Sequence, residues 1–578
     1  MLYYNSNMGA DIERMQVVLV NLISPHLAYD QNALASQTLA RYLHARVPDV
    51  TVNVVDMQAI YNNKRAKTNS NSEALASAGQ CVVDTIRDTC AAGPSIIGLS
   101  VKWQTKQVAS EIVMSIQRDL TDRAPLFLLG NIGTTLAYQE LLSHHPFTDT
   151  LAVVGEGEDA LVSIVERAKA NLPNYRDKKQ YIGIPNVAIN VDGKLEEFER
   201  QVVDLALYPR FDSEYDFRLR GEVSPSATYN LETSRGCPWG KCTFCSIETL
   251  FMVGKPPTKM RQSGWRPFPT RLVLDHIYAV AKTRGVRSFD ISDSEFLGYI
   301  GVGSKKDPDL FEDSIMRAEQ FAMGLIEINE ELGLRGHERL RIEHISVRAD
   351  AVYREGEPDN NLRRRDIFGL LKQAGIQGIF FGIESGSPGQ LRRYGKGITV
   401  QENKQALEIL RKMGFSIEVG FIFFDHNATL QNLSENLKFI HAARLYEIDS
   451  RILVSLKILA GSPLANKHSR DHTKDTDLLV YTAPYRDPAV GEIEKLFQVW
   501  EEPTRELIKT LPIAERLQIR HLDLDFMEDL VGAYMHGVSI IPVLRKHVQT
   551  RGSYLSQLQS KGMSSDKATD PPALISKN

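Results

Sequence analysis

Three of the five cysteines of the chain lie within nine residues, in the segment SRGCPWGKCTFCSI. Cys237, Cys242 and Cys245 are separated by four and then by two residues, and thiolates held this closely favour a soft metal. A structural zinc site would need a fourth cysteine or histidine nearby, but the next histidine is His276. Three thiolates can instead hold three irons of a 4Fe-4S cluster and leave the fourth iron open for a chelating ligand. The spacing therefore predicts a catalytic cluster; the alternative, three cysteines packed in a core, is disfavoured by the interrupting Pro, Gly and Lys.

Alternating strand and helix candidates flank this segment on both sides. Before it, amphipathic stretches separate apolar runs, as in βαβ units with a parallel sheet; the runs are 17–23, 50–57, 95–101, 125–131 and 151–158. After it, six further strand candidates alternate with amphipathic segments, at 228–234, 287–292, 341–347, 378–385, 416–424 and 451–458. The first series predicts a doubly wound Rossmann-like domain. The second predicts a partial TIM-type β/α barrel, in which chemistry takes place where strands end and loops begin.

These patterns divide the chain into five parts. We expect the Rossmann-like domain at 1–167, a connector at 168–228 and the barrel at 229–480. The connector contains an alternation of apolar and polar residues around Asp192-Gly193, which is typical of a tight hairpin. A helical C-terminal region is expected at 481–555, followed by a disordered tail at 556–578.

The composition is that of a soluble globular protein, with 43% hydrophobic and 24% charged residues. A net charge of -4 gives no field that would gather nucleic acid or an anionic membrane, so small-molecule or peptide substrates are the expected partners. The N-terminus shows no signal-peptide pattern, and no apolar run approaches the ~20 residues needed to span a bilayer. We therefore expect a cytoplasmic location. Cys81 and Cys90, nine residues apart on an expected helix, are assigned to core packing.

The cysteine segment resembles that of the radical S-adenosylmethionine (SAM) superfamily, whose motif has an aromatic residue before the last cysteine, here Phe244. The resemblance implies a 4Fe-4S cluster whose open iron binds the amino and carboxylate groups of SAM. It also implies that electron transfer cleaves SAM to methionine and a 5'-deoxyadenosyl radical. The superfamily's usual spacing is three and then two residues, so this chain has one extra residue in the first arm, at Gly240 or its neighbour.

Three later segments extend the resemblance. FDISDSEFL resembles the second barrel strand of these enzymes, where polar residues such as Asp293 face the SAM side, and RIEHISVRADAV, with Arg348 and Asp350, resembles the third. The resemblance implies that Phe244, Asp293 and Arg348 bind cofactor. FFGIESGSPGQLRRYGKGIT resembles the cobalamin-dependent branch, which implies that Gly382, Glu384 and Ser385 meet SAM. A carboxylate is chemically suitable there because the ammonium and ribose hydroxyl groups of SAM need acceptors. The alternative for Glu384 is a strand-end carboxylate paired with a nearby arginine.

The front domain resembles the cobalamin-binding domains fused to this branch, through SIIGLSV, FLLGN and VVGEGEDALV. Glycines at strand ends let the backbone approach a large cofactor. The candidate cofactor-binding residues are Ser100, Lys102, Trp103, Gly130, Asn131, Gly155, Glu156 and Gly157. The D-x-H-x-x-G motif, which supplies a histidine to cobalt in other cobalamin enzymes, is absent, because His26 has neither the Asp nor the Gly. The alternative is a degenerate domain that binds nothing.

The resemblance implies an enzyme with three cofactors, namely a 4Fe-4S cluster, SAM and cobalamin. Its expected reaction is methylation of an unactivated carbon in a natural product or peptide, with a flavodoxin or ferredoxin as electron donor and without nucleic-acid or membrane partners. One alternative keeps the cofactors but cyclises, rearranges or epimerises the substrate. A second alternative is a non-catalytic iron-sulfur protein for electron transfer or sensing.

Overall fold

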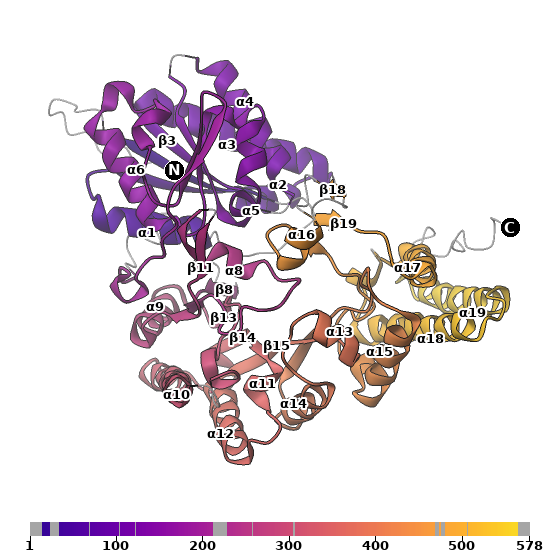
Figure 1. Cartoon of the computed structure of the whole chain (residues 1–578). Helices are drawn as coiled ribbons and strands as arrows, with labels where there is room; N and C mark the ends of the chain where they lie inside the picture. Colours follow the sequence, from indigo (N-terminus) through magenta and orange to yellow (C-terminus); the bar gives the residue numbers. More distant parts are fainter. Residues whose placement is uncertain are drawn as a thin grey trace.

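The computed structural model describes residues 14–23, 34–211, 228–468, 473–475 and 480–563, except 69, 103, 122, 257, 304–306 and 506. Figure 1 shows three parts in chain order: an α/β domain in indigo and purple, a β/α barrel in magenta to orange, and a group of C-terminal helices in yellow. This is the predicted mixed α/β architecture. Within the described residues, no helix is both long enough and apolar enough to cross a membrane.

The front domain is built on a seven-stranded sheet in the order β2-β1-β3-β4-β5-β6-β7. Its parallel strands are β1 (Gln16–Asn21), β2 (Thr51–Asp56), β3 (Ser95–Ser100), β4 (Leu126–Gly130) and β5 (Leu151–Val153). Two separate apolar cores cover its faces, because side chains alternate along each strand: Val18 and Val20 belong to one core, Val17 and Leu19 to the other. The predicted doubly wound domain is therefore confirmed.

Helices lie on both faces of this sheet (Figure 1). The core of Val17 and Leu19 includes residues of α1 (Leu34–Arg46) and α6 (Glu158–Ala170). The opposite core includes residues of α3 (Asn71–Ala92) and α4 (Lys106–Asp119), and α2 (Met57–Arg65) packs against α3. Helix α5 (Asn131–Ser143) follows β4 directly. Residues 71–79, which are small and polar, form the first turns of α3; the side chain of Ser70 caps this helix by accepting from the Glu73 amide.

The predicted hairpin is present but belongs to the front sheet. β6 (Val187–Val191) and β7 (Lys194–Glu197) pair antiparallel around the turn at Asp192-Gly193, and β6 pairs antiparallel with β5. The part of the chain expected to be a connector therefore extends the sheet and satisfies the outer edge of β5, which would otherwise be unpaired. The expected boundary at residue 167 lies within α6.

The barrel has five parallel strands in the order β16-β15-β14-β13-β8. They are β8 (Thr228–Leu231), β13 (Ser288–Ile291), β14 (Arg341–Arg348), β15 (Ile376–Glu384) and β16 (Ser416–Phe421). The predicted sixth strand, 451–458, is reduced to a parallel bridge between Phe424 and Ser455 and a few neighbouring backbone bonds. The sheet is therefore an open, partial barrel.

Five helices follow the barrel strands or cover the sheet: α9 (Thr270–Arg284), α10 (Pro308–Glu331), α12 (Pro358–Ala374), α14 (Val400–Lys412) and α15 (Leu430–Ala442). The C-terminal region consists mainly of α17 (Pro488–Glu501), α18 (Ile513–His536) and α19 (Ile541–Ser560), as predicted. The rings of Trp500 and Phe526 stack between α17 and α18 with centroids 4.3 Å apart. Helix α19 continues to Ser560, past the expected boundary at 555, and residues 564–578 of the expected tail lie outside the described residues.

Candidate active site

The cysteine loop begins directly after the first barrel strand. β9 (Ser234–Arg235) pairs antiparallel with β12 (Arg266–Pro267), and the loop then leads into the short helix α8 (Ile247–Leu250). Gly240 has φ +58°, a left-handed conformation that suits glycine, and its carbonyl accepts from Gln262 Nε2 at 2.7 Å. This geometry favours Gly240 as the residue that accommodates the longer first arm of the motif.

A second segment, residues 393–397, holds the cysteine loop in place. The amide of Thr243 donates to the carbonyl of Tyr394 at 2.8 Å, and Trp239 Nε1 donates to the carbonyl of Gly395 at 2.8 Å. The ring of Phe244 packs edge-on against Tyr394, with centroids 5.6 Å apart. Phe244, expected to be near SAM, therefore also anchors the loop. The two motifs that carried the resemblance are thus packed directly against each other.

The three thiols are free and half-buried. Burial raises the pKa of Cys237 to about 11 and that of Cys245 to about 12, and both other thiols add to the shift at Cys245. Within the described residues, no three His, Cys, Asp or Glu side chains are arranged as a ready metal site. The three thiols lie in one loop, and those of Cys237 and Cys242 interact electrostatically with Cys245, as ligands of a shared cluster with one open iron would.

Two buried cations lie beside these thiols. Arg348 and Lys396 both interact electrostatically with Cys242, and Arg348 also interacts with Cys237. Arg348 lowers the pKa of Cys237 and Lys396 lowers that of Cys245, in each case by less than burial raises it. The two cations would balance the negative charge of a thiolate-bound group.

Glu384 lies at the end of β15, where a bulge interrupts the pairing with β16. Its φ is +65°, which is uncommon for a residue other than glycine and places it in a strained backbone region. Its Oε1 is 2.9 Å from Lys396 Nζ, so the carboxylate pairs with a lysine and not with the arginine of the alternative. Gly382 leaves room for this pair, because a Cβ there would lie 2.8 Å from Glu384 Oε1.

The other predicted SAM-side residues have protein partners. Arg348 makes a two-pronged ion pair with the buried Asp350, both contacts at 3.0 Å, and also donates to the carbonyl of Lys396 at 2.8 Å. The hydroxyl of Ser385 is fully buried, 2.7 Å from Gln390 Oε1. These contacts position the strand ends around Glu384.

Asp293 anchors the start of the cysteine loop. Its carboxylate accepts from the Thr233 amide at 2.7 Å and from the Ser234 hydroxyl at 2.6 Å. A carboxylate not anticipated from the sequence, Glu295, accepts from the amides of Leu297 and Arg348, and burial raises its pKa to about 8. Its position in the predicted second-strand segment was the only available signal.

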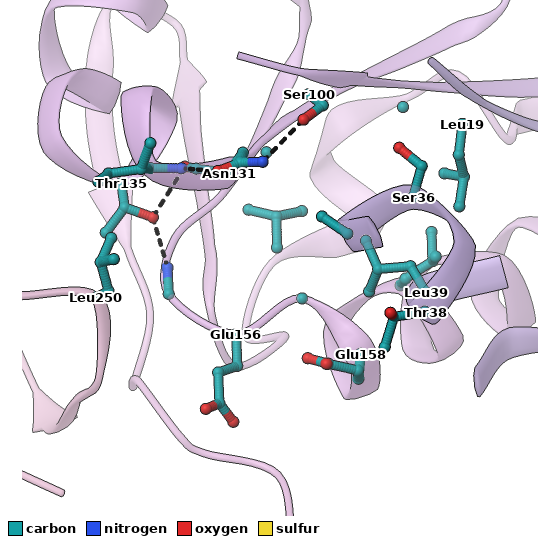
Figure 2. A pocket seen from close by; sticks show the side chains of 18 of the residues that line it. Leu19, Ser36, Thr38, Leu39, Ser100, Asn131, Thr135, Glu156, Glu158 and Leu250 are labelled. Carbon is teal, nitrogen blue, oxygen red and sulfur yellow. Dashed lines mark hydrogen bonds between the residues drawn. The ribbon is translucent and has the colours of Figure 1, made fainter. Parts of the chain in front are cut away.

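A cavity of about 250 Å³ lies at the carboxyl ends of β3, β4 and β5 in the front domain (Figure 2). Six predicted cofactor-binding residues line it: Ser100, Gly130, Asn131, Gly155, Glu156 and Gly157. Asn131 Nδ2 donates to Ser100 Oγ at 2.8 Å, and the Gly155 amide donates to Thr135 Oγ1 at 3.0 Å (Figure 2). Ligands in open α/β sheets bind at this edge, so the cavity is placed as a cofactor site requires.

The prediction for Lys102 is not supported by the geometry. Its Nζ donates to Asn21 Oδ1 at 2.5 Å and interacts with Asp56, and it does not line the cavity. The side chain of Lys102 lies at the ends of β1 and β2, where Asn21 accepts its hydrogen bond and Asp56 supplies a negative charge. Trp103 lies outside the described residues.

The cavity is closed by elements that the sequence did not mark. Helix α1 contributes residues 34–36, 38 and 39, and the barrel contributes Glu232, Arg235, Leu250 and Phe251. Ser36, Thr38 and Leu39 are visible opposite Asn131 and Ser100 in Figure 2. No motif identifies these residues: the α1 residues reach the cavity because α1 packs on the front sheet, and the barrel residues reach it because the barrel docks on the front domain.

Buried ion pairs fix this docking. Arg235 contacts Glu158 at 2.7 Å, Glu232 at 3.0 Å and Glu156 at 3.4 Å, and Arg266 also pairs with Glu156. Burial opposes ionisation of Glu158, but Arg235 overcomes it and lowers the pKa of that carboxyl. Burial raises the pKa of Glu232 to about 7. The carboxylate of Glu156, predicted to bind cofactor, therefore forms ion pairs with Arg235 and Arg266 across the domain boundary.

The cavity borders the segment that follows the cysteine loop. Leu250 ends the helix that follows Cys245 by two residues, and both Leu250 and Phe251 line the cavity. The Leu250 carbonyl would be 3.3 Å from a Cβ on Gly155. The two candidate cofactor sites therefore share a wall.

Comparison with known proteins agrees with this arrangement. Residues 231–440 match the radical SAM superfamily. The chain is 28% identical over 553 residues to 4'-phospho-dehydrooxetanocin synthase of Priestia megaterium, which covers 85% of this chain and 65% of that protein. It is 24% identical over 363 residues to the anaerobic magnesium-protoporphyrin IX monomethyl ester cyclase of Cereibacter sphaeroides, covering 61% of this chain and 48% of the cyclase. The chain thus spans less than two thirds of the length of either relative.

Two solved structures share the fold. One is the cobalamin-dependent SAM radical enzyme OxsB with aqua-cobalamin and SAM bound, with a TM-score of 0.73, 20% identity, and coverage of 96% of this chain and 82% of that one. The other is the radical SAM methyltransferase TsrM from Kitasatospora setae with cobalamin and a 4Fe-4S cluster, with a TM-score of 0.55, 17% identity, and coverage of 79% and 78%. Residues 231–440 therefore match the radical SAM superfamily in sequence, and the chain has the fold of these two solved enzymes.

Proposed function

We propose that this protein is a cobalamin-dependent radical SAM enzyme that transfers a methyl group to an unactivated carbon of a small molecule or peptide. The observation that carries the proposal is the shared wall: the helix after Cys245 lines the front-domain cavity through Leu250. A cysteine loop whose following helix lines the cofactor cavity would bring two cofactors near one substrate.

The residues divide into groups by cofactor. Cys237, Cys242 and Cys245 would hold a 4Fe-4S cluster, and Glu384 with Lys396 would face the polar groups of SAM. The cavity edge from Ser100 to Gly157 would hold cobalamin. When bound, the cluster and SAM supply a hydrogen-abstracting radical and cobalamin supplies a methyl group, while the protein supplies placement and excludes water.

We further propose an electron-donor protein for the cluster and a cytoplasmic location for the enzyme. A flavodoxin or ferredoxin would deliver the electron to the cluster, in a cytoplasmic enzyme without nucleic-acid or membrane partners. The net charge of -4 supports the absence of polyanionic partners. A non-catalytic iron-sulfur protein would have no use for the strained Glu384 and its buried lysine partner.

The test is a single anaerobic incubation of the reconstituted protein with SAM, cobalamin and a reductant. Formation of 5'-deoxyadenosine is expected, and a substrate should then gain one methyl mass. A protein that carries the cluster but forms no 5'-deoxyadenosine would be the electron-transfer or sensing alternative.

A second candidate keeps the cofactors but rearranges or cyclises the substrate. It is favoured by the relatives, since one is a dehydrooxetanocin synthase and another a cyclase. The same incubation separates the two functions, because a rearranged product has no added methyl group.

A further inference from the structure

A cavity of about 730 Å³ lies among the C-terminal helices, away from both candidate cofactor sites. It is lined by residues of α17 and α18, by the turns that connect these helices, and by residues 449–453. The hydroxyl of Ser450 accepts from the Val419 amide of β16 at 2.9 Å, so this last segment lies beside β16, whereas the cysteine loop follows β8 at the opposite edge of the barrel sheet. None of its described lining residues lines the front cavity. The proposed function therefore leaves this cavity without a ligand.

One carboxylate in the cavity is shared by two arginines. Arg516 and Arg520 are four residues apart on α18, so their side chains project from the same face of the helix. Arg520 Nη1 is 2.8 Å and Arg516 Nε is 3.3 Å from Asp449 Oδ1. All three side chains line the cavity. Two guanidinium groups and one carboxylate leave one excess positive charge in this group, the Asp449 cluster.

A second group of the same kind includes Glu501, the last residue of α17. Arg451 Nη2 is 2.6 Å from Glu501 Oε1, and Arg505 Nη2 is 3.6 Å from Glu501 Oε2. This Glu501 cluster lines the same cavity and also has one excess positive charge. Burial lowers the pKa of Arg520, and Arg451 lowers it further, so the two clusters repel each other. An anion held between them would relieve this repulsion.

The rest of the lining leaves these charges uncancelled and adds an apolar surface. A third carboxylate, Asp523, accepts a hydrogen bond from Trp500 Nε1 at 2.7 Å and interacts with Arg551, which does not line the cavity. Its charge is therefore balanced from behind the cavity. The apolar lining residues are Ile452, Leu453, Phe497 and Ile508.

We propose that this cavity binds a small organic phosphate, with the phosphate between the two clusters and the organic part against the apolar residues. A phosphate monoester carries about two negative charges at neutral pH and has three acceptor oxygens. It therefore matches two excess positive charges and the forked donors of arginine. An anion of the same shape with a single charge leaves one cluster unmatched. The site is independent of the proposed function.

The test compares three probes by titration calorimetry on the full-length protein, at a pH above the second pKa of the phosphate, about 6. The probes are phenyl phosphate, phenyl sulfate and inorganic phosphate. Phenyl sulfate has the shape of phenyl phosphate but one negative charge, and it should bind about tenfold more weakly or less tightly still. Inorganic phosphate lacks the ring and should also bind more weakly than phenyl phosphate.

Variants that change the charge of the clusters should shift the affinity in opposite directions. Arg451→Gln and Arg516→Gln should each weaken phenyl phosphate binding about tenfold or more, because each removes a charge-assisted hydrogen bond. Glu501→Gln should strengthen it, because it releases two arginines; a merely structural role of Glu501 predicts weaker binding. Arg363→Gln on α12 is the matched control, since Arg363 is also a partly exposed arginine paired with a carboxylate, that of Glu312, and it should change nothing.

Several results would overturn the proposal: no binding of phenyl phosphate, equal affinity for phenyl sulfate, wild-type affinity in either arginine variant, or weaker binding to Glu501→Gln. Displacement of the probe by cobalamin or SAM would do so as well, since it would place the probe in a cofactor site. Equal affinity for inorganic phosphate would disprove the role of the apolar residues. Thermal unfolding checks that each variant is folded. Formation of 5'-deoxyadenosine enters none of these measurements, so failure of the proposed function is separate from failure of this site.

Discussion

Replacing Gly397 by alanine tests whether the close packing of the two motif segments holds the cysteine loop. Gly397 has φ +71°, and an added Cβ would lie 2.2 Å from Trp239 Cζ2. The left-handed conformation costs alanine about 1 kcal/mol, and overpacking costs roughly 1–3 kcal/mol more. The Trp239 ring is tied by its bond to Gly395 and lies 4.9 Å below the Arg348 guanidinium, which limits its relief. We therefore expect Gly397→Ala to lose about 2–4 kcal/mol in total.

Denaturant unfolding measures the free energy of unfolding of each variant. Formation of 5'-deoxyadenosine reports whether the cysteine loop still supports cleavage of SAM. Gly414→Ala is the matched control, because Gly414 has φ +74° with no atom within 4 Å of the added Cβ, and only the backbone cost of about 1 kcal/mol is expected. A Trp239→Phe background removes Cζ2 and the rest of the second ring. There, Gly397→Ala should cost about 1–2 kcal/mol less than in the wild type.

The reasoning would be refuted if Gly397→Ala and Gly414→Ala lost equal stability, because the contact with Trp239 would then carry no energy. An unchanged cost in the Trp239→Phe background would refute it in the same way. Full 5'-deoxyadenosine formation by a destabilised Gly397→Ala protein would show that the loop tolerates displacement.

Three further predictions concern the cofactors. Cys242→Ala should abolish 5'-deoxyadenosine formation, as measured by liquid chromatography. Cys81→Ala, on α3 of the front domain, should retain it. Full activity of Cys242→Ala would contradict the cluster assignment. Electron paramagnetic resonance of bound cob(II)alamin should show no splitting from an axial protein nitrogen, because no histidine is among the described residues lining the cavity, and such splitting would disprove this. Each methylated product should accompany about one 5'-deoxyadenosine and one S-adenosylhomocysteine; 5'-deoxyadenosine without the other coproduct or a methyl gain would favour the rearrangement alternative.

Much of the fold could be predicted from the sequence, because periodicity marks buried strands directly. The apolar runs 17–23 and 95–101 became β1 and β3, and the Asp192-Gly193 pair marked a real hairpin. Where that hairpin docks is set by the unpaired edge of β5, which no local pattern reveals. The prediction of a sixth barrel strand was wrong for a similar reason. Residues 451–458 have the composition of a strand but pair in parallel only through a bridge to Phe424.

The candidate site was predictable where its residues are adjacent in the sequence. The three thiols lie in one loop, and Gly382 with Glu384 lies at one strand end. Partners set by the fold of a loop were not predictable: Lys396 as the cation for Glu384, and Gln390 as the partner of Ser385, depend on how residues 385–397 fold back on the strand. Lys102 does not line the cavity, because proximity to a strand end does not fix the direction of a side chain.

The wall between the cysteine loop and the front cavity has a thermodynamic consequence. Leu250 and Phe251 are the last residues of the loop segment and also part of the cavity lining, so any shift of the loop on taking up a ligand changes the shape of the cavity. Occupancy of the two sites is then linked, and linkage is reciprocal: whatever the first ligand contributes to the affinity for the second, the second returns to the first. The order in which the protein is loaded therefore changes the route to the filled state and leaves its total binding free energy unchanged.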